Sequence, residues 1–586
     1  MKRILLIGML ACALFVSCKK ENEGGGASGG GGYVPPKEWT VMGTVKDTDN
    51  KPLAGVVVSD GITCVQTDAN GIYQLPADLS KKDKDGNDRY VFVSTPSGYT
   101  AYTSAGQAVF WEWLRNHKTK KGSDGKYRGV DFTLTKIAQA DQERFTILIY
   151  ADPQPRLSTA GAVENYAFHS LDICKDMYDD MKEYVSTTLT GRPVYGICLG
   201  DIVHQNTSLL SDYRNGMATT GITHYNVIGN HDQGSKDGMT DDTSCQAYES
   251  YMGPANYSFN LGGLHFLMLD NMMVQDGKKS DECATGLTDE IWQFVQSDLA
   301  FVSRDTPLMV CAHSPMCRMI EGKDRTGSHL AEMRALFSQY PRAYVWAGHT
   351  HSSFNYVDKS NPKIESHTLG RVTGALWTNE YLSENGTPRG YVVFDYDKSK
   401  GAGKEISWKF KPTFIQKAEY SGVSGTYDYT YRDWDYDASG KAILKANRGG
   451  GALTDKYQMQ VFAPGTYAAD DKTVYANIFL WDELWGTPMF YFNGSSSGST
   501  MTRMTASNFP QLRYSFADWD ITAKYAEKYS FLKKSWYDDD GKDPSNKMRN
   551  CASIFRYKIN TTEDHGNGIV KVKDRFGVEH TASLSW

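Results

Sequence analysis

The stretch Tyr225-Asn226-Val227-Ile228-Gly229-Asn230-His231-Asp232 joins an apolar segment to a glycine and three polar residues. The apolar part is typical of a buried β-strand, and the glycine permits a tight turn that presents the side chains after it. Amide, imidazole and carboxylate groups in such a position can bind a metal ion or transfer protons. The stretch therefore predicts a functional site at the carboxyl end of a strand.

Four other apolar segments between residues 144 and 360 end in the same way. They cover residues 145–150, 194–199, 308–312 and 343–346. The polar residues that follow them are Asp152 and Gln154, then Gly200-Asp201, then His313, and finally Gly348-His349-Thr350-His351. In open α/β sheets, ligands bind beyond the carboxyl ends of the strands. The sequence therefore predicts one site built from the ends of five strands.

Helix-like segments separate the predicted strands. In one of them, apolar residues recur three or four positions apart and so share one face: Ala167, Leu171, Cys174, Tyr178, Met181 and Val185. In another, Thr288 precedes Asp289-Glu290 and is a plausible N-cap. This alternation of strand and helix favours an α/β domain over residues 144–360.

The order of the five motifs resembles that of the calcineurin-like metallophosphoesterases, and the resemblance covers the whole of residues 144–360. It implies a centre of two divalent metal ions. The first ion would be surrounded by Asp152, Gln154, Asp201 and His351, and the second by Asp201, Asn230, His313 and His349. Asp201 would bridge the ions, and a hydroxide between them would attack the phosphorus of a phosphate ester. This mixed ligand set suits Mn, Fe or Zn.

The resemblance also implies catalytic roles for His231 and Asp232. His231 directly follows a metal ligand, so it is expected to point into the site without completing either ligand set. We expect it to stabilise the transition state and to protonate the leaving oxygen. Asp232 is expected to orient His231.

Two positions depart from the family pattern. Gln154 stands where the first motif usually has a histidine, and an amide oxygen is a harder and weaker donor than imidazole. Either the first metal is held more loosely, or it is an oxygen-preferring ion such as Mn or Mg. His204 follows the Gly-Asp pair where the family often has an aspartate, and it is expected either to contact substrate or to lie exposed in a loop. Arg318 is a second candidate for substrate binding, although an exposed arginine near a helix start is common.

Short strand patterns separated by turn signals flank the α/β domain. Residues 38–136 resemble a prealbumin-like β-sandwich in the runs around Gly43, Pro52 and Thr67, and we expect a spacer or adhesion role for them. Residues 366–586 are rich in Tyr and Trp and predict a C-terminal β-rich domain. The predicted fold is therefore multidomain, α/β plus all-β, with a central metallophosphoesterase α/β sandwich flanked by two β-rich domains.

The N-terminus has the pattern of a bacterial lipoprotein signal. Lys2 and Arg3 precede an apolar stretch over residues 4–17, which is too short to span a bilayer, and Cys18 follows a small residue. Residues 1–17 are thus predicted to be removed, Cys18 to be lipidated, and residues 18–37 to form a Gly/Ser-rich tether. An ordinary secretory signal with an incidental cysteine is the alternative. The lipoprotein interpretation places the protein in the cell envelope, on the periplasmic or outer face of a Gram-negative-type outer membrane.

Composition excludes several classes of protein. The chain has 586 residues, of which 40% are hydrophobic and 23% charged, so it is not disordered throughout. Its formal net charge of −6 does not favour binding to nucleic acid through a basic patch. An oxidising compartment permits disulfides, but Cys198 and Cys311 lie in apolar strand patterns and are expected to be buried thiols.

Two classes of function remain open. The leading interpretation is a lipid-anchored hydrolase that cleaves a phosphomonoester or a phosphodiester in a small molecule or glycan. The alternative is a non-catalytic surface lipoprotein that binds glycan or protein and carries a decayed phosphoesterase domain. Trp481, Trp485 and Tyr491 support this alternative, because aromatic rings stack on sugars. The joint presence of all five motifs opposes decay.

Overall fold

The computed structural model describes residue 36 and residues 38–156, 170–234, 239–275, 282–318, 324–359, 361–374, 387–413, 434–445, 450–465, 472–504, 553–560 and 565–586. All described residues belong to one compact unit, Pro35–Trp586. The predicted signal peptide, Cys18 and most of the predicted tether therefore lie outside the described residues.

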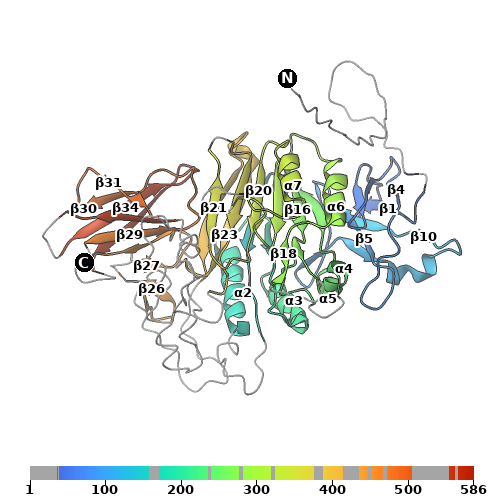
Figure 1. Cartoon of the computed structure of the whole chain (residues 1–586), viewed down its shortest axis with the longest axis horizontal. Coiled ribbons are helices and arrows are strands. Elements are labelled where there is room, and N and C mark those ends of the chain that lie inside the picture. Colours follow the sequence, from blue (N-terminus) through green and yellow to red (C-terminus); the bar gives the residue numbers. More distant parts are fainter. Residues whose placement is uncertain are drawn as a thin grey trace, which may run out of the picture. The chain divides into compact units, whose positions relative to one another are not determined.

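A seven-stranded sheet with the order β24-β23-β12-β13-β14-β8-β7 forms one half of the central α/β region (Figure 1). The predicted motif strands β12, β13 and β14 pair in parallel, whereas β23 pairs antiparallel to β12. The strands are β7 (Tyr102–Ser104), β8 (Gln107–Val109), β12 (Arg144–Tyr150), β13 (Val194–Cys198), β14 (Thr223–Asn226), β23 (Gly390–Asp397) and β24 (Ile406–Pro412).

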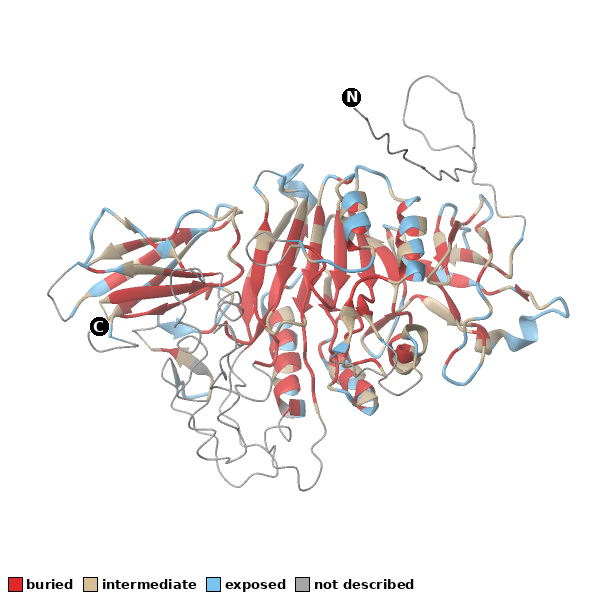
Figure 2. Cartoon of the chain, in the orientation of Figure 1, coloured by how far each residue is buried: buried red, intermediate tan, exposed pale blue. Residues whose placement is uncertain are grey.

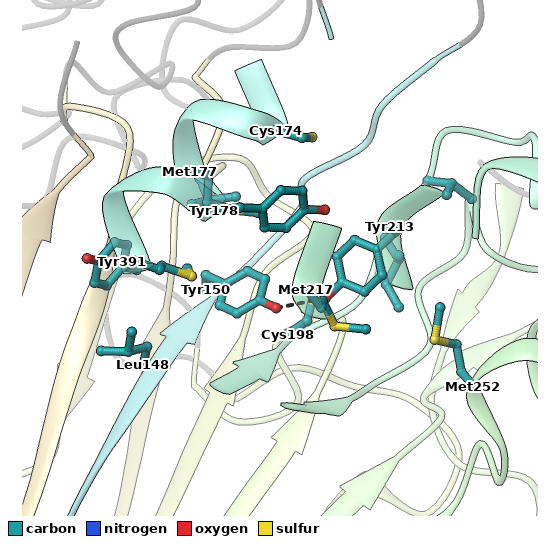
Figure 3. Close-up of a cluster of buried hydrophobic side chains, with 14 of the residues drawn as sticks. Leu148, Tyr150, Cys174, Met177, Tyr178, Cys198, Tyr213, Met217, Met252 and Tyr391 are labelled. Carbon is teal, nitrogen blue, oxygen red and sulfur yellow. Dashed lines mark hydrogen bonds between the residues drawn. The ribbon is translucent and has the colours of Figure 1, made fainter. Parts of the chain in front are cut away.

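Helices α2 (Ser170–Thr187), α3 (Leu210–Thr219) and α5 (Gln246–Met252) pack on this sheet through a common hydrophobic core (Figure 3). The predicted apolar face of α2 is largely buried, with Cys174, Tyr178 and Met181 in the core. Leu171 differs from the prediction, because it lies at the start of the helix and is 37% exposed. Ala167 lies outside the described residues.

A six-stranded sheet with the order β15-β16-β19-β20-β22-β21 forms the other half. Its strands are β15 (Tyr257–Leu261), β16 (Leu264–Leu269), β19 (Leu308–Ala312), β20 (Ala343–Ala347), β21 (Phe354–Val357) and β22 (Ile364–Thr368), of which β16, β19, β20 and β22 pair in parallel. Helices α6 (Asp289–Leu299) and α7 (Leu330–Phe337) accompany it, and the Thr288 side chain caps α6 as predicted. Figure 2 shows that the strands of the central sheets are mostly buried.

The ends of the two central sheets do not coincide with the predicted domain boundaries. The β7–β8 hairpin comes from residues assigned to the N-terminal domain, yet β8 pairs with β14. Strands β22, β23 and β24 lie beyond residue 360, yet they belong to the two central sheets. The α/β region therefore takes strands from both flanking segments.

The remaining N-terminal residues form two small sheets, with the orders β10-β1-β11-β6 (β4 pairing with β1) and β3-β2-β5-β9. Their strands are β1 (Val41–Asp47), β2 (Val57–Ser59), β3 (Cys64–Gln66), β4 (Ile72–Leu75), β5 (Tyr90–Ser94), β6 (Tyr99–Thr100), β9 (Trp111–Trp113), β10 (Tyr127–Arg128) and β11 (Phe132–Lys136). Short elements elsewhere are α1 (Gln139–Glu143), α4 (Asp241–Ser244), β17 (Met272–Met273) and β18 (Ala284–Thr285).

The C-terminal residues form two four-stranded sheets, β28-β29-β33-β32 and β31-β30-β34-β35, which share a hydrophobic core, and a small β25-β26-β27 sheet. The strands are β25 (Trp434–Tyr436), β26 (Ala442–Leu444), β27 (Gly451–Ala452), β28 (Met459–Phe462), β29 (Thr473–Ile478), β30 (Met489–Phe492), β31 (Ser499–Thr500), β32 (Thr502–Arg503), β33 (Ile554–Lys558), β34 (Asn567–Lys573) and β35 (Glu579–Ser585). The predicted multidomain architecture, α/β plus all-β, is confirmed.

Two further sequence-based expectations concern membrane spans and cysteines. Within the described residues, no helix combines the length and the apolar character that crossing a membrane requires. Cys198 and Cys311 are buried free thiols, as predicted.

Candidate metal centre

The polar residues that follow the five motif strands meet where the carboxyl edges of the two central sheets adjoin. Strands β12, β13 and β14 of one sheet present Asp152, Asp201 and Asn230, and strands β19 and β20 of the other present His313 and His349. Asp152 and His313 are fully buried, whereas His349 is half-buried. The site thus draws on two sheets instead of the single sheet edge from which it was predicted.

In the described part of the chain, two groups of side chains could hold a metal ion, and Asp201 belongs to both. Asp201, His313 and His349 form one group, and Asp152, Asp201 and His351 form the other. Within each group, the potential ligand atoms lie within 4.8 Å of one another. Each group contains three of the four residues that the resemblance implied for one ion, and the two groups share one carboxylate.

Around His313, nitrogen and oxygen atoms converge on one point. His313 Nε2 lies 3.2 Å from Asp201 Oδ1 and 3.2 Å from His349 Nδ1, and His349 Nδ1 lies 3.1 Å from Asn230 Oδ1. His313 Nδ1 lies 2.8 Å from the backbone oxygen of Leu199, to which it can donate its proton. That bond leaves Nε2 free to bind a metal, which is how ligating histidines are usually oriented.

Around Asp152, the buried amide of Gln154 gives a second sign of a cation. Gln154 Nε2 donates to Asp201 Oδ2 at 2.9 Å, and His351 Nε2 lies 3.6 Å from Asp152 Oδ1. Gln154 Oε1 is buried and has no hydrogen-bond partner in the described part of the chain. An unsatisfied buried carbonyl oxygen costs about 1–3 kcal/mol, a cost that a bound cation would remove. The residues therefore fit a metal at both positions, with Gln154 as an oxygen ligand.

The backbone at this site is strained. Positive φ angles are sterically unfavourable for residues other than glycine. They occur at five of the predicted metal ligands, namely Asp152 (54°), Gln154 (43°), Asp201 (51°), His349 (67°) and His351 (56°). Glycines next to the ligands leave no room for a side chain, since a Cβ on Gly348 would lie 2.4 Å from Asp152 Oδ2. Such strain at a cluster of polar side chains is typical of a functional site.

The buried carboxylates repel each other unless positive charge is present. Burial raises the pKa of Asp152 to about 8, although His313 acts in the opposite direction. Burial also opposes ionisation of Asp201, but the neighbouring His313 imidazole outweighs it and holds the pKa of Asp201 well below its usual value. Two divalent cations would favour the ionised form of both groups. The pKa shifts of Asp152 and Asp201 and the arrangement of the side chains therefore both indicate a site for cations.

His231 lies at the edge of the two ligand groups and stacks on His204. The two imidazole rings are 4.3 Å apart and inclined by 27°, and the backbone N–H of His231 donates to Asp201 Oδ1 at 3.0 Å. Burial, followed by the charge of His231, lowers the pKa of His204 to about 3, so its ring is neutral. His204 is thus a half-buried neighbour of His231 and not an exposed loop residue.

Asp232 and Arg318 are held by other groups. The fully buried Asp232 carboxylate accepts hydrogen bonds from the backbone N–H groups of Val203 (2.9 Å) and Gly229 (2.8 Å), so it ties together the two loops that carry Asp201 and His231. Arg318 forms ion pairs with Asp358 (3.2 Å) and Asp324 (3.5 Å). Its role in substrate binding stays a prediction.

The sequence analysis missed two residues that support the ligand-bearing loops. Buried Arg371 donates from Nε to the backbone oxygen of Asp152 (3.1 Å) and from Nη2 to that of Pro153 (3.2 Å). Asn271 exchanges two hydrogen bonds with the backbone of Ser314, directly after His313. Both residues follow strands, β22 and β16, whose carboxyl ends lie at the same edge. Both residues could have been found by considering the polar residues after every apolar segment, and not only after the five motif strands.

One comparison with known proteins, a match to a family model, agrees with the predicted family over the N-terminal residues. Residues 39–136 match the family model described as the N-terminal part of calcineurin-like phosphoesterases. Solved structures similar to this chain include a purple acid phosphatase from seeds of yellow lupin (Lupinus luteus), at 13% identity and a TM-score of 0.31, covering 61% of this chain and 72% of that one. The sulfate thiohydrolase SoxB of Thermus thermophilus has 12% identity and a TM-score of 0.27, covering 47% of this chain and 57% of that one. No curated protein matches the chain.

Proposed function

We propose that this chain is a calcineurin-like metallophosphoesterase and that it hydrolyses phosphate esters with two divalent metal ions bound at Asp201 and its neighbours. The observation that carries this proposal is the sharing of Asp201 between two groups of potential ligands. A carboxylate common to two ions is what a dinuclear hydrolytic centre requires. The joint arrangement of all five motifs also argues against a decayed, purely binding domain.

The residues divide into two ligand sets and one proton donor. We assign Asp152, Gln154, Asp201 and His351 to the first ion, and Asp201, Asn230, His313 and His349 to the second. Ions such as Mn, Fe or Zn would supply positive charge to the phosphoryl oxygens and lower the pKa of water. Gln154 would bring a neutral oxygen to the first ion, which favours Mn over softer metals there.

His231 would protonate the leaving oxygen. Its backbone bond to Asp201 fixes it beside both ligand groups, and the neutral ring of His204 stacks against it. Asp232 fixes the loop of His231 through the backbone of Gly229. An imidazole held in this way can deliver a proton without occupying a ligand position.

Metal analysis tests the dinuclear centre. The chain from residue 35 onward, loaded with excess Mn and freed of unbound metal, should contain about two ions per chain. Asp201→Asn should weaken both sites, because it alters the shared ligand, while Arg318→Gln should leave the metal content unchanged. A wild-type chain that binds no metal would overturn the proposal. Assays with nitrophenyl phosphate and bis(nitrophenyl) phosphate would then separate monoester from diester substrates.

We also propose that the protein is a lipoprotein of the cell envelope, acting on a phosphorylated small molecule or glycan near the membrane. The support for this is the basic, apolar and small-residue pattern that ends at Cys18, and the Gly-rich residues after it. Cys18→Ser should abolish partition into the detergent phase in Triton X-114 extraction. A mutant that still partitions there would show that something other than Cys18 anchors the chain.

A further inference from the structure

A cavity of about 340 Å³ lies where the N-terminal sheets meet the α/β region. One wall comes from the β2–β3 turn and the segment up to β5, and the other from α4, the end of β16 and the start of α6. Burial raises the pKa of two lining groups, Tyr90 and Cys245, so both stay uncharged near neutral pH. The charged side chains that line the cavity are Asp60, Lys81, Arg89, Asp241, Asp242, Asp270 and Glu290, and Glu249 binds Arg89 from behind.

The two basic groups of the cavity already have acidic partners. Arg89 forms ion pairs with Asp242 (2.7 Å) and with Glu249. Lys81 forms ion pairs with Glu290 (2.8 Å) and Asp242 (3.5 Å). These contacts join the N-terminal sheets to helices α4, α5 and α6, and they leave no positive charge for the other carboxyl groups.

Three carboxyl groups at the cavity have no cationic partner. Asp60, Asp241 and Asp270 form no ion pair with any residue that the structure describes. Removing a carboxylate from water without a counter-ion is costly, and several carboxylates around one cavity also repel one another. The excess negative charge must therefore be neutralised by protons or by a bound cation.

Two of these carboxyl groups are held by one short stretch of backbone. Asp270 accepts hydrogen bonds from the backbone N–H of Met272 and from Gln233 Nε2, both at 3.0 Å, and Asp241 accepts one from the backbone N–H of Val274 at 2.8 Å. Burial is the main cause that raises the pKa of Asp241 to about 6. Burial, followed by the charge of Asp241, raises the pKa of Asp270 well above its usual range.

A metal ion does not explain the arrangement of these groups. Within the described residues, clusters of at least three potential ligands whose atoms lie within 4.8 Å of one another occur only around Asp201. We propose that protons neutralise the cavity, so that the N-terminal sheets and the α/β region are joined most firmly at mildly acidic pH and less firmly as Asp241 and Asp270 ionise. The inference does not depend on the metal centre, because no candidate metal ligand lines the cavity.

The direction of the pH effect follows from the difference between the closed and the open joint. Opening exposes the carboxyl groups to water, where their pKa is near the ordinary value of 3.8. The open state therefore holds fewer protons than the closed state above this pH, and opening becomes easier as the pH rises. The contribution of Asp241 is complete above about pH 6, whereas that of Asp270 extends further.

Hydrogen–deuterium exchange tests the joint in the chain from residue 35 onward, with chelator present throughout. After correction for the intrinsic pH dependence of exchange, protection in residues 57–66 and 241–252 should fall roughly 10- to 100-fold between pH 4.5 and 7.5, relative to residues 567–585. Asp241→Asn and Asp270→Asn should each reduce this fall by about threefold or more. The double variant should reduce it further.

Asp242→Asn is the matched control, because it makes the same change of charge on the same helix but removes a carboxylate that is already ion-paired. It should lower protection at every pH and leave the fall with pH at least as large as in the wild type.

Two results would overturn the inference. One is a wild-type protection ratio that does not change with pH, or a fall that persists unchanged in the double variant. The other is full protection of the wild type at pH 7.5 upon addition of excess calcium or spermidine, without the same effect on the double variant. That result would show that a bound cation, and not protons, neutralises the cavity.

Discussion

At the scale of single residues, several candidate metal ligands have backbone angles that are sterically unfavourable for any residue with a side chain. Asp152, Asp201 and His351 have left-handed backbone angles that cost roughly 1–3 kcal/mol each. Glycine would relieve this strain at any of the three positions, but it would also remove a metal ligand. The centre is therefore expected to be a locally destabilised region of the metal-free chain, and bound metal is expected to offset that destabilisation.

Replacement of His351 separates strain from ligation. In the metal-free chain, His351→Gly should be more stable than His351→Ala by about 1 kcal/mol, because only glycine accepts a φ of 56° without penalty. Both variants should lose the same metal site. Chemical unfolding in the presence of chelator measures the difference in free energy of unfolding. Equal stability of the two variants would show that the backbone at residue 351 is not strained.

Replacement of His231 tests the proton donor. His231→Ala should lower kcat by about 10²–10⁴-fold for alkyl phosphates, and less for nitrophenyl phosphate, whose leaving group departs without a proton. Its metal content should stay near that of the wild type. His313→Ala is the comparison, because it should lose metal and be slow with both esters. An equal loss of rate for both esters in His231→Ala would remove the acid role from this residue.

At the scale of secondary-structure elements, the site depends on how strand ends are held. The β12–α2 connection carries Asp152 and Gln154, and its backbone oxygens are bound by Arg371 from the end of β22. The β19–α7 connection carries His313 and is held by Asn271 from the end of β16. These two ligand-bearing loops are thus each fixed by a side chain from a strand that supplies no ligand itself.

Arg371→Lys should weaken the first metal site selectively. A lysine keeps the charge but can reach fewer of the backbone oxygens of Asp152, Pro153 and Gln154, so the loop should lose its fixed geometry. We expect a 10- to 100-fold loss of affinity for one of the two metals, the usual effect of removing a group that orients ligands. Calorimetric titration with Mn should show one weakened and one unchanged site. Equal weakening of both would refute a selective role.

The sequence predicted which side chains would lie together, because each candidate ligand follows an apolar strand whose end faces the same edge. It did not reveal Arg371, because β22 lies beyond residue 360 and its residues had been attributed largely to the C-terminal domain. Nor could it reveal that Asp232 binds backbone N–H groups of Val203 and Gly229, since that depends on how two loops approach in space. Strand β8, of three residues, is too short for its pairing with β14 to be read from periodicity.

At the scale of the whole molecule, a buried ion-pair cluster links the central and C-terminal sheets. Arg575, from the turn between β34 and β35, donates to Glu365 of β22 at 2.6 and 2.9 Å and to Asp482 at 2.9 Å. Glu365 and Asp482 are fully shielded from solvent. Breaking such a buried pair usually costs about 3–5 kcal/mol, so the cluster is expected to matter for the stability of the whole chain.

This cluster predicts a pH dependence of stability. Burial alone would raise the pKa of Glu365, but His367 and Arg575 outweigh it and hold the pKa at about 2, below the ordinary value of 4.5. The stabilisation is therefore complete above pH 4.5 and is lost as the pH falls towards 2. Urea unfolding should show wild type more stable than Glu365→Gln at pH 6, with the difference shrinking on acidification.

Glu483→Gln is the control for this pH dependence. Burial raises the pKa of Glu483, so its ionisation destabilises the fold as the pH rises. This pH dependence is opposite in sign to that of Glu365. Relative to wild type, Glu483→Gln should gain stability with increasing pH. The difference in free energy of unfolding between wild type and Glu365→Gln could instead stay constant from pH 6 to pH 3. That result would show that the ionisation of Glu365 does not cause the pH dependence.

The pairing of β8 with β14 has a consequence for how this protein can change in evolution. Strand β14 leads directly to Asn230 and His231, and its outer edge is covered by a hairpin encoded in the N-terminal segment. Gene fusion or recombination that exchanged the N-terminal segment alone would leave an uncovered strand edge beside the loop of Asn230 and His231, and uncovered strand edges are a known starting point for aggregation. The two segments are therefore expected to be inherited together, and chimeric proteins should work only when the hairpin and its acceptor strand come from the same parent.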